Sequence, residues 1–307
     1  MKTIRIAIQG ELGSFSHEAA LRMFEGQGAV AELEVCALSA QVFERLAAGH
    51  VDSAVIPIEN SLAGPVAEHY DLLLRHPVRI TRELRLRIRH NLIGPPGLRI
   101  DQVECVSSHP VALAQCGRFL AAHPRMKVMP YYDTAGSVKQ AMEHPDSRMA
   151  GIASAQAAAE YGGGILAAGI EDYEENYTRF HLLRRVGQPE TGEADESGAS
   201  LEARAAPKAN PLGTAPNRIA DVAPDKMSLA FAVAHRPGTL VKALESLARC
   251  GVDLTKIDSR PVPGKPWEYV FFVDIRFSSE EMADASLRAL AGPCLMVKEL
   301  GRYIAAS

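Results

Sequence analysis

Cysteine is scarce and irregularly spaced in this sequence of 307 residues. The count of five is odd and no two cysteines have CxxC spacing, so the pattern is that of neither a disulfide framework nor a zinc site. Reduced thiols in a cytoplasmic protein are the expectation. The five are Cys36, Cys105, Cys116, Cys250 and Cys294.

The sequence also lacks an excess of basic residues and any long run of apolar residues. Lys and Arg total 33 against 37 for Asp and Glu, a net charge of −4, whereas a nucleic-acid binder carries a basic face. The first ten residues interleave Lys2 and Arg5 with isolated apolar residues and lack the apolar core of a signal peptide. The least charged stretch, 149–170, contains Gln156 and Glu160 and is not a membrane span. We therefore expect neither nucleic acid nor membrane as a partner.

Residues 188–225 form a break in composition. Eight of these 38 residues are Gly or Pro, and the large apolar ones are only Leu201, Leu212, Ile219 and Val222. Such a segment buries too little surface to offset its ordering entropy, which predicts a flexible linker. The chain is thus divided into a domain at 1–187, a linker at 188–225 and a domain at 226–307.

The first domain alternates short apolar runs with helical patterns, which indicates an α/β fold with a mostly parallel sheet and helices on both faces. Strands are predicted at 4–9, 54–59, 91–94 and 149–154, and helices at 16–24, 112–120 and 138–142. In such folds ligands bind at the carboxyl ends of the strands.

The second domain has a different order of elements. Strands are predicted at 226–235, 252–261, 267–277 and 295–304, and helices at 237–251 and 278–292. The order βαββαβ is that of a ferredoxin-like unit.

Two stretches at strand ends are candidates for ligand binding. GELGSFSHEAA (10–20) follows the first strand, and Ser14 at a helix start offers an anion site, although a capped turn without a ligand explains it equally well. AVIPIENSLAGPV (54–66) ends in Glu59, Asn60 and Ser61, which belong either to a ligand site or to a turn that satisfies its own backbone.

Two further stretches carry polar groups that suit substrate chemistry. In SSHPVALAQC (107–116), His109 either orients a substrate oxygen or caps a helix. IEDYEENYTRF (170–180) holds an acidic run, interpreted as a solvated face, and then Asn176, Thr178, Arg179 and Phe180. A guanidinium binds a carboxylate in bidentate geometry, a threonine hydroxyl can donate a proton, and Phe180 can exclude water. The sequence contains no GxSxG, HExxH or P-loop motif, and no set of metal ligands is apparent.

Together and in this order, these four stretches resemble prephenate dehydratase, and HRPGTL (235–240), DLTKIDSRP (253–261) and WEYVFFVDI (267–275) resemble the phenylalanine-sensing ACT domain of that family. The resemblance implies conversion of prephenate to phenylpyruvate, with loss of carbon dioxide and water, in phenylalanine biosynthesis. It implies a two-subdomain catalytic part like a type II periplasmic binding protein, no cofactor and no metal. No room is left before the first motif for a chorismate mutase domain, so a monofunctional enzyme is expected.

The resemblance also implies residue roles. Thr178 is expected to protonate the departing hydroxyl, Arg179 to hold a substrate carboxylate, and Phe180 to shape the pocket. The residues expected to line the substrate cleft are Ser14, Glu59, Asn60, Ser61, His109 and Asn176.

Phenylalanine is expected as an allosteric effector, bound between paired ACT domains of a homodimer or homotetramer. The residues implied are Pro237, Gly238, Thr239, Leu240, Asp258, Ser259, Arg260 and Pro261. The family's usual glutamate is Asp258 here, and Thr239 replaces its alanine. Two alternatives stay open: arogenate dehydratase, which acts on the transaminated substrate, and a non-catalytic amino-acid sensor.

Overall fold

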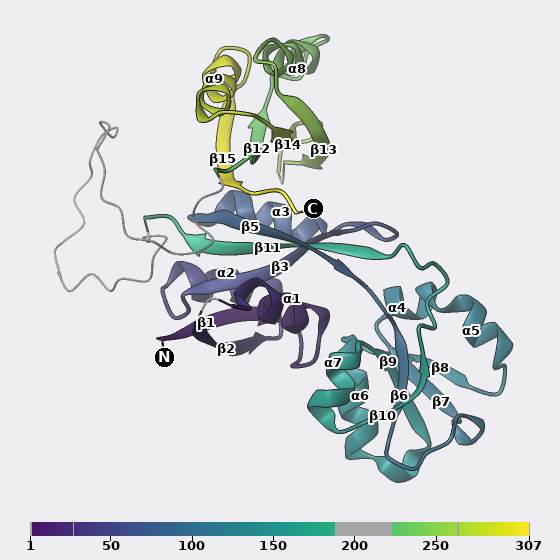
Figure 1. Ribbon diagram of the computed structural model, residues 1–307. Helices are drawn as coiled ribbons and strands as arrows, with labels where there is room; N and C mark the ends of the chain where they lie inside the picture. Colours follow the sequence, from purple (N-terminus) through teal and green to yellow (C-terminus); the bar gives the residue numbers. More distant parts are fainter. Residues whose placement is uncertain (1, 27, 188–222, 263, 307) are drawn as a thin grey trace.

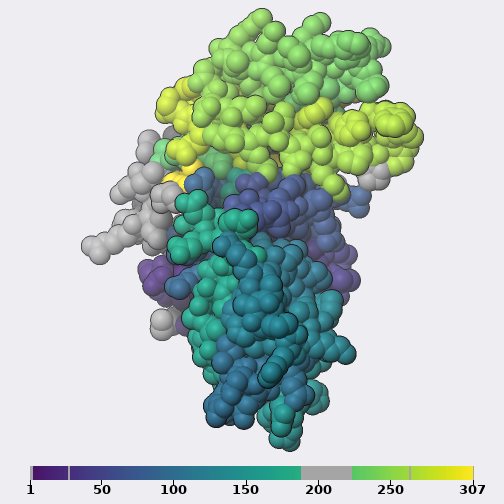
Figure 2. Space-filling view, turned by 90° about the vertical axis from the view of Figure 1, so that its right-hand side faces the viewer, coloured from purple at the N-terminus to yellow at the C-terminus, as the bar shows by residue number. Residues whose placement is uncertain are grey.

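The computed structural model describes residues 2–26, 28–187, 223–262 and 264–306. They form two α/β lobes and a C-terminal module (Figure 1). Lobe 1 contains the residues before about 88 and those from about 171 to 187, and lobe 2 contains the residues from about 88 to 171. The predicted linker at 188–225 lies outside the described residues except for its last three. Figure 2 shows the C-terminal module at one end of the molecule and lobe 2 at the other.

Lobe 1 is built on a sheet of strand order β2-β1-β3-β11-β5, with β4 paired to β3. Its strands are β1 (Lys2–Gln9), β2 (Ala29–Cys36), β3 (Ser53–Asn60), β4 (Gly64–Pro65), β5 (Val78–Arg87) and β11 (Tyr177–Arg185). Its helices are α1 (Phe15–Phe24), α2 (Ser39–Ala47) and α3 (Ala67–Arg75). The helix α1 covers one face of the sheet through Met23 and Phe24, and α2 and α3 cover the other through Phe43 and Leu73.

Lobe 2 has a second sheet, of order β10-β6-β9-β7-β8. Its strands are β6 (Asn91–Gly94), β7 (Cys105–Ser108), β8 (Lys127–Pro130), β9 (Met149–Ala153) and β10 (Gly164–Ala168). Its helices are α4 (Pro110–Gln115), α5 (Gly117–Ala122), α6 (Thr134–Glu143) and α7 (Ala155–Tyr161), with short 3₁₀ turns η1 (Ile100–Gln102) and η2 (Pro145–Ser147). The single helix predicted at 112–120 is two helices, because the chain turns at Cys116, where φ is −116° and ψ is 26°.

The expected two-lobe α/β fold is present, but the prediction of a mostly parallel sheet is wrong. In lobe 1, β1 pairs in parallel with β2 and β3, whereas β11 is antiparallel to both β3 and β5. In lobe 2, β6 is antiparallel to β9 and β10. The reason is that the chain leaves lobe 1 after β5 and returns to it as β11, so the returning strand runs against its neighbours.

The C-terminal module has the predicted order βαββαβ. It consists of β12 (Lys226–Ala232), α8 (Thr239–Arg249), β13 (Asp253–Pro261), β14 (Tyr269–Arg276), α9 (Glu280–Ala291) and β15 (Met296–Tyr303), with sheet order β13-β14-β12-β15. Its two helices cover one face of this sheet, packing on Phe231 and Ile275.

The other face of that sheet packs on lobe 1. Phe272, Leu300 and Tyr303 belong to the same buried apolar cluster as Tyr70 and Ile80 of lobe 1. At Gly301 the backbones of β15 and β5 approach so closely that a Cβ atom would collide with the carbonyl of Ile80. The module is therefore docked through a shared hydrophobic core rather than tethered. Among the described residues, no helix has the length and apolarity needed to cross a membrane.

Candidate active site

Three side chains from two distant segments of the chain meet where lobe 1 faces lobe 2. The amide Nδ2 of Asn60, at the end of β3, lies 2.7 Å from Oδ1 of Asn176 and 3.0 Å from Oγ1 of Thr178. Thr178 pairs with Asn60 across the sheet, so the two side chains share one face of it. Asn176 is fully buried and Thr178 is 8% exposed. These three of the predicted site residues are thus brought together.

The orientation of the Asn60 amide follows from its neighbours. Its Oδ1 accepts hydrogen bonds from the backbone N–H groups of Leu62 and Ala63, at 3.0 and 2.9 Å, so its nitrogen must face Thr178. The Thr178 hydroxyl therefore accepts a hydrogen bond, and within the described residues it makes no other. Accepting a hydrogen bond polarises a hydroxyl, which makes its proton a better donor.

Gln115, at the end of α4, carries this network into lobe 2. Its Nε2 donates to Oδ1 of Asn60 at 3.2 Å, and its Oε1 accepts from Nδ2 of Asn176 at 2.9 Å. Sequence reasoning missed Gln115, although it is the one long polar side chain in the apolar run 111–116.

His90 completes the network and was also missed. Its Nε2 lies 2.9 Å from Oε1 of Gln115, and its ring meets Phe15 edge-on at 5.6 Å. Burial lowers the pKa of His90, and the contacts with Gln115 and Glu171 oppose that shift only in part. The ring is therefore neutral near pH 7, and the whole junction network is uncharged.

The loop before α1 forms a second contact between the lobes. Ser14 caps α1, its Oγ accepting from the N–H of His17 at 3.3 Å. The carbonyl of Gly13 accepts from Ser154 Oγ of lobe 2 at 2.7 Å. At Gly13, φ is +80° and a Cβ would lie 2.7 Å from the Cα of Ala157, so only glycine fits. Ser14 thus sits at the junction, as predicted, and its hydroxyl serves the helix start.

His109 lies at the start of α4. Its Nδ1 accepts from the N–H of Val111 at 3.2 Å, which is the capping role considered from the sequence. The carboxyl group of Asp133, which caps α6, is close enough for the two to interact electrostatically, and burial raises the pKa of that carboxyl. A carboxyl with a raised pKa beside a histidine is a feature that sequence reasoning missed.

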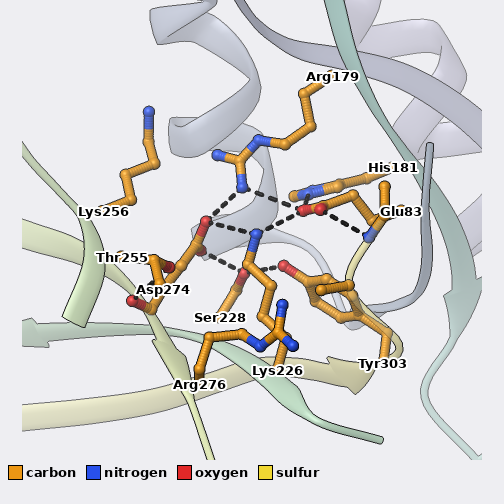
Figure 3. A network of polar contacts seen from close by, with 12 residues as sticks. Glu83, Arg179, His181, Lys226, Ser228, Thr255, Lys256, Asp274, Arg276 and Tyr303 are labelled. Atoms are coloured by element: carbon orange, nitrogen blue, oxygen red, sulfur yellow. Dashed lines mark hydrogen bonds and ion pairs between the residues drawn. The ribbon is translucent and has the colours of Figure 1, made fainter. Parts of the chain in front are cut away.

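Arg179 and Glu59 do not face this junction, in contrast to the prediction for both. Consecutive strand residues point to opposite faces, and Arg179 lies on the face of β11 that is covered by the C-terminal module. There its guanidinium pairs with Asp274 of β14 and with Glu83 of β5 (Figure 3). Glu59 pairs with Lys256 of β13 and lies 3.3 Å from Nε of Arg179.

Two other expectations need adjustment. Phe180 is 1% exposed within the apolar cluster of α1, β3 and β5, so it supports the sheet beneath Thr178 rather than lining open space. Ser61 is exposed and binds the backbone, accepting from the N–H of Tyr177 at 3.0 Å.

The acidic run before Asn176 is only partly solvated. Glu171 accepts from the N–H of His90 at 2.9 Å, and Asp172 accepts from the N–H of Arg118 at 2.9 Å. These carboxylates hold the segment that returns to lobe 1. Among the described residues, no group of three or more His, Cys, Asp or Glu side chains is placed to hold a metal ion.

The C-terminal module has a cavity of about 180 Å³ at its surface. Gly238, Thr239 and Leu240 of the first predicted effector stretch line it. The second stretch, 258–261, lies on β13 and does not line it; there Arg260 pairs with Asp71 of lobe 1 at 2.9 Å. Within one chain the two stretches do not form a common pocket.

Comparison with known proteins shows what this chain is similar to. The family model described as prephenate dehydratase matches residues 6–188. A bifunctional chorismate mutase/prephenate dehydratase of Aquifex aeolicus is 33% identical over 98% of this chain and 74% of its own length. Arogenate dehydratase/prephenate dehydratase 2, chloroplastic, of Arabidopsis thaliana is 34% identical over 98% of this chain and 72% of its own length.

Solved structures are similar over the whole chain. Prephenate dehydratase from Arthrobacter aurescens, in complex with L-Phe, has a TM-score of 0.78 at 27% identity and covers 98% of this chain and 90% of its own. A protein described as GqqA, a novel type of quorum quenching acylase, has a TM-score of 0.78 at 28% identity and covers 98% of both chains.

Proposed function

The chain belongs to the prephenate dehydratase family, and we propose that it converts prephenate to phenylpyruvate with loss of carbon dioxide and water. Prephenate is a dianion whose ring becomes aromatic when carboxylate and hydroxyl leave together. The reaction needs a site that binds the substrate, excludes water and supplies one proton. It needs no nucleophile, and the family resemblance implies no cofactor.

The observation that carries this proposal is the setting of Thr178. Its hydroxyl is nearly buried between the lobes and accepts from Asn60, and its own proton is unused within the described residues. Thr178 is therefore the proposed donor to the departing hydroxyl. Asn60, Asn176 and Gln115 are the proposed substrate contacts, because neutral amides can exchange partners with a ligand without leaving a charge unpaired.

The substrate carboxylates need partners other than Arg179. That guanidinium is held by carboxylates on the far face of the sheet. We propose instead that the N-terminus of α1 at Ser14 binds one carboxylate, since helix starts attract anions through their N–H groups. Ser61, which directly follows Asn60, and His109, at the start of α4, are proposed as further contacts.

Residues 226–307 are proposed to be an ACT domain that senses phenylalanine. The cavity beside Gly238 and Leu240 supports an effector site. The hydroxyl of Thr239 donates to the carbonyls of Ala234 and Arg236, at 2.7 and 2.9 Å, so it is turned away from a ligand. Apolar side chains exposed on the module, Val241, Leu254, Ile257 and Trp267, support pairing into a homodimer or homotetramer. Five free thiols support a cytoplasmic location.

Two variants test the role of Thr178. Thr178→Val keeps the shape and removes the hydroxyl, so kcat is expected to fall about 10²- to 10⁴-fold while prephenate still binds. Thr178→Ser keeps the hydroxyl and should retain most of the activity. Phenylpyruvate formation, followed by absorbance, gives both values. Near-normal kcat in Thr178→Val would reject the acid role, and an inactive wild-type protein would reject the function itself in favour of a sensor.

The plant relative named for both activities keeps arogenate as an alternative substrate. Arogenate carries an ammonium group where prephenate has a ketone, so the choice depends on pocket contacts to that group. Steady-state kinetics on the two substrates side by side decide it: a higher kcat/KM for arogenate would replace the proposed substrate and keep the chemistry.

Regulation is tested with L-Phe added to the same assay. We expect L-Phe to lower the rate and to shift the sedimentation coefficient, because binding between paired modules links the effector to assembly. A titration that alters neither quantity would overturn the regulatory proposal without affecting the catalytic one.

A further inference from the structure

Four buried charged side chains lie on the face of β11 opposite Thr178, and we call them the charge cluster: Glu83, Arg179, Lys226 and Asp274. Glu83 and Arg179 come from lobe 1, and Lys226 and Asp274 come from the C-terminal module. Figure 3 shows the four pointing toward one another across the interface. Arg179 is the residue next to Thr178 in the chain, so the cluster begins one residue from the proposed proton donor.

The pairing crosses the interface in both directions. Arg179 of lobe 1 donates to Asp274 of the module, and Lys226 of the module donates to Glu83 of lobe 1 at 2.7 Å. Each part also keeps a pair of its own: Arg179 lies 3.1 Å from Glu83, and Lys226 lies 3.4 Å from Asp274. Each part thus contributes one cation and one carboxylate, and the two pairs across the interface form only when both parts are in place.

Because the four side chains are buried, the loss of any one of these ion pairs is energetically unfavourable. The four residues are between 4% and 7% exposed, and a buried charge that loses its partner keeps its desolvation penalty. Asp274 is further held by Ser228, whose hydroxyl donates to Oδ1 at 2.6 Å. Glu83 accepts from the backbone N–H of Ala306 at 3.1 Å. Each of the two cluster carboxylates that contact Arg179 is thus anchored by a group of the C-terminal module.

The backbone beside Arg179 is irregular. The pairing of β11 with β3 shifts register between Arg179 and Phe180, so Arg179 faces Glu59 while Phe180 faces Pro57. Bulges of this kind re-aim side chains and loosen the ladder locally. The register shift thus lies directly beside Arg179, one residue beyond Thr178.

The space beside the cluster allows movement. A cavity of about 320 Å³ lies between lobe 1 and the module, next to Arg179, Lys226 and Asp274, and every residue that lines it is polar. The cluster therefore has one polar side with room for small side-chain movements, while the apolar packing of the module on lobe 1 stays in place.

From these observations we propose that Asp274 is a positioning residue for Thr178. Asp274 holds Arg179 on the face of β11 that the module covers, and it thereby sets the direction of the Thr178 hydroxyl on the opposite face. This inference rests on the proposed role of Thr178. The C-terminal module then helps to position the catalytic hydroxyl. A movement of Asp274 changes the position of Thr178 through the Arg179–Asp274 ion pair and the peptide unit between residues 178 and 179. The route is physical and contiguous, as coupling between sites requires.

The test compares Asp274→Asn with Lys298→Met. Lys298 also joins the module to lobe 1, donating to the carbonyls of Leu73, Leu74 and His76, but it does not touch β11. Asp274→Asn is expected to lower kcat about 10- to 100-fold, because small misplacements have effects of that size, with KM for prephenate nearly unchanged. Lys298→Met should leave both constants near wild type.

A second readout does not depend on activity. Hydrogen–deuterium exchange of the amides at 177–181 should rise in Asp274→Asn and not in Lys298→Met. An inactive wild-type protein would count against the proposed function, whereas equal exchange in the two variants would count against the positioning role. Equal kcat in the two, from an active wild type, would also overturn it.

Should Asp274→Asn fail to fold, as judged by circular dichroism, Ser228→Ala takes its place. This change removes the hydrogen bond that orients Asp274 and keeps every charge. The expected result is a several-fold lower kcat with unchanged KM and faster exchange at 177–181. Wild-type values for both in a folded Ser228→Ala protein would overturn the proposal.

Discussion

The two faces of strand β11 show two different ways of joining parts of one protein. On the face toward lobe 2, Thr178 sits among neutral amides: Asn60, Asn176 and Gln115 exchange hydrogen bonds across the junction. On the opposite face, Arg179 sits among buried ions that bind the C-terminal module. One strand thus takes part in a neutral junction and an ionic one, a single residue apart.

The difference follows from what each junction must do. Amides keep usable donors and acceptors when a substrate replaces a neighbour, so the neutral junction can open and close with a ligand. Buried ions tolerate no such exchange, because an unpaired charge in the interior is strongly unfavourable. The ionic junction therefore holds its parts in one geometry, and the neutral junction is suited to binding.

The largest expected effect comes from breaking the ionic junction. Glu83→Gln removes one of the two buried carboxylates that Arg179 and Lys226 share, and we expect the free energy of unfolding to fall by about 3–5 kcal/mol. Asp71→Asn is the matched control, since Asp71 pairs with Arg260 across the same interface but both side chains are 29% exposed. Its effect should stay below about 1 kcal/mol. Urea denaturation measures both, and equal effects would contradict the distinction between the two pairs.

The stabilisation by the ionic junction is expected to depend on pH. Burial by itself raises the pKa of Glu83, but contacts with His181 and Lys226 outweigh it, and the pKa lies well below its usual value. Burial also raises the pKa of Asp274, but the contacts with Arg179 and Lys226 outweigh it, and this pKa is lowered as well. Their contribution to stability is complete above the unfolded-state pKa, about 4, and is lost as the pH falls toward the lower folded values.

The gap in unfolding free energy between wild type and Glu83→Gln should therefore shrink as the pH drops below about 4. A protonated glutamic acid resembles glutamine, and the two proteins converge. A gap that stays constant down to the acid transition would show that the charge of Glu83 is not what stabilises the interface.

The smallest effect is expected at the neutral junction. Gln115→Leu leaves the buried Nδ2 of Asn176 without its acceptor, which costs about 1–3 kcal/mol. Ser61 is exposed, so Ser61→Ala should change the free energy of unfolding by less than about 0.5 kcal/mol. Chemical denaturation at pH 7 compares them. A loss in Gln115→Leu as large as that in Glu83→Gln would remove the contrast between the junctions.

Part of the site was predictable from strand ends and part only from the family resemblance. Asn60 ends β3, where an α/β fold binds ligands, whereas Thr178 begins β11 and was expected at the site from the resemblance. The grouping of Asn60, Asn176 and Thr178 is as expected from the sequence. Gln115 was missed although it lies in SSHPVALAQC (107–116), because within that stretch only His109 was considered for substrate chemistry. His90 lies in the crossing between the lobes, where the sequence has no motif.

The error over Arg179 and Glu59 has a specific cause. A motif read along the chain suggests that Thr178, Arg179 and Phe180 share one pocket, whereas a strand sends neighbouring side chains to opposite faces. Nothing in the linear pattern says which face is covered by a module that begins at residue 226. The antiparallel return of β11 was missed for the same reason: strand direction depends on the route between lobes.

The amino-acid order alone determined some of the strands and helices, among them β1, β3, β6 and β9, because apolar periodicity and turn residues act locally. It did not predict α2, α3, β5 or β11. It also determined the βαββαβ order of the C-terminal module and the polar residues at the strand ends. Only the tertiary structure decided which of those residues meet, since Thr178 and Arg179 are neighbours in the chain but partners of different parts of the molecule. Which side chains come into contact across a hundred or more positions in the sequence depends on how the sheets pack on one another, and the local sequence does not specify that packing.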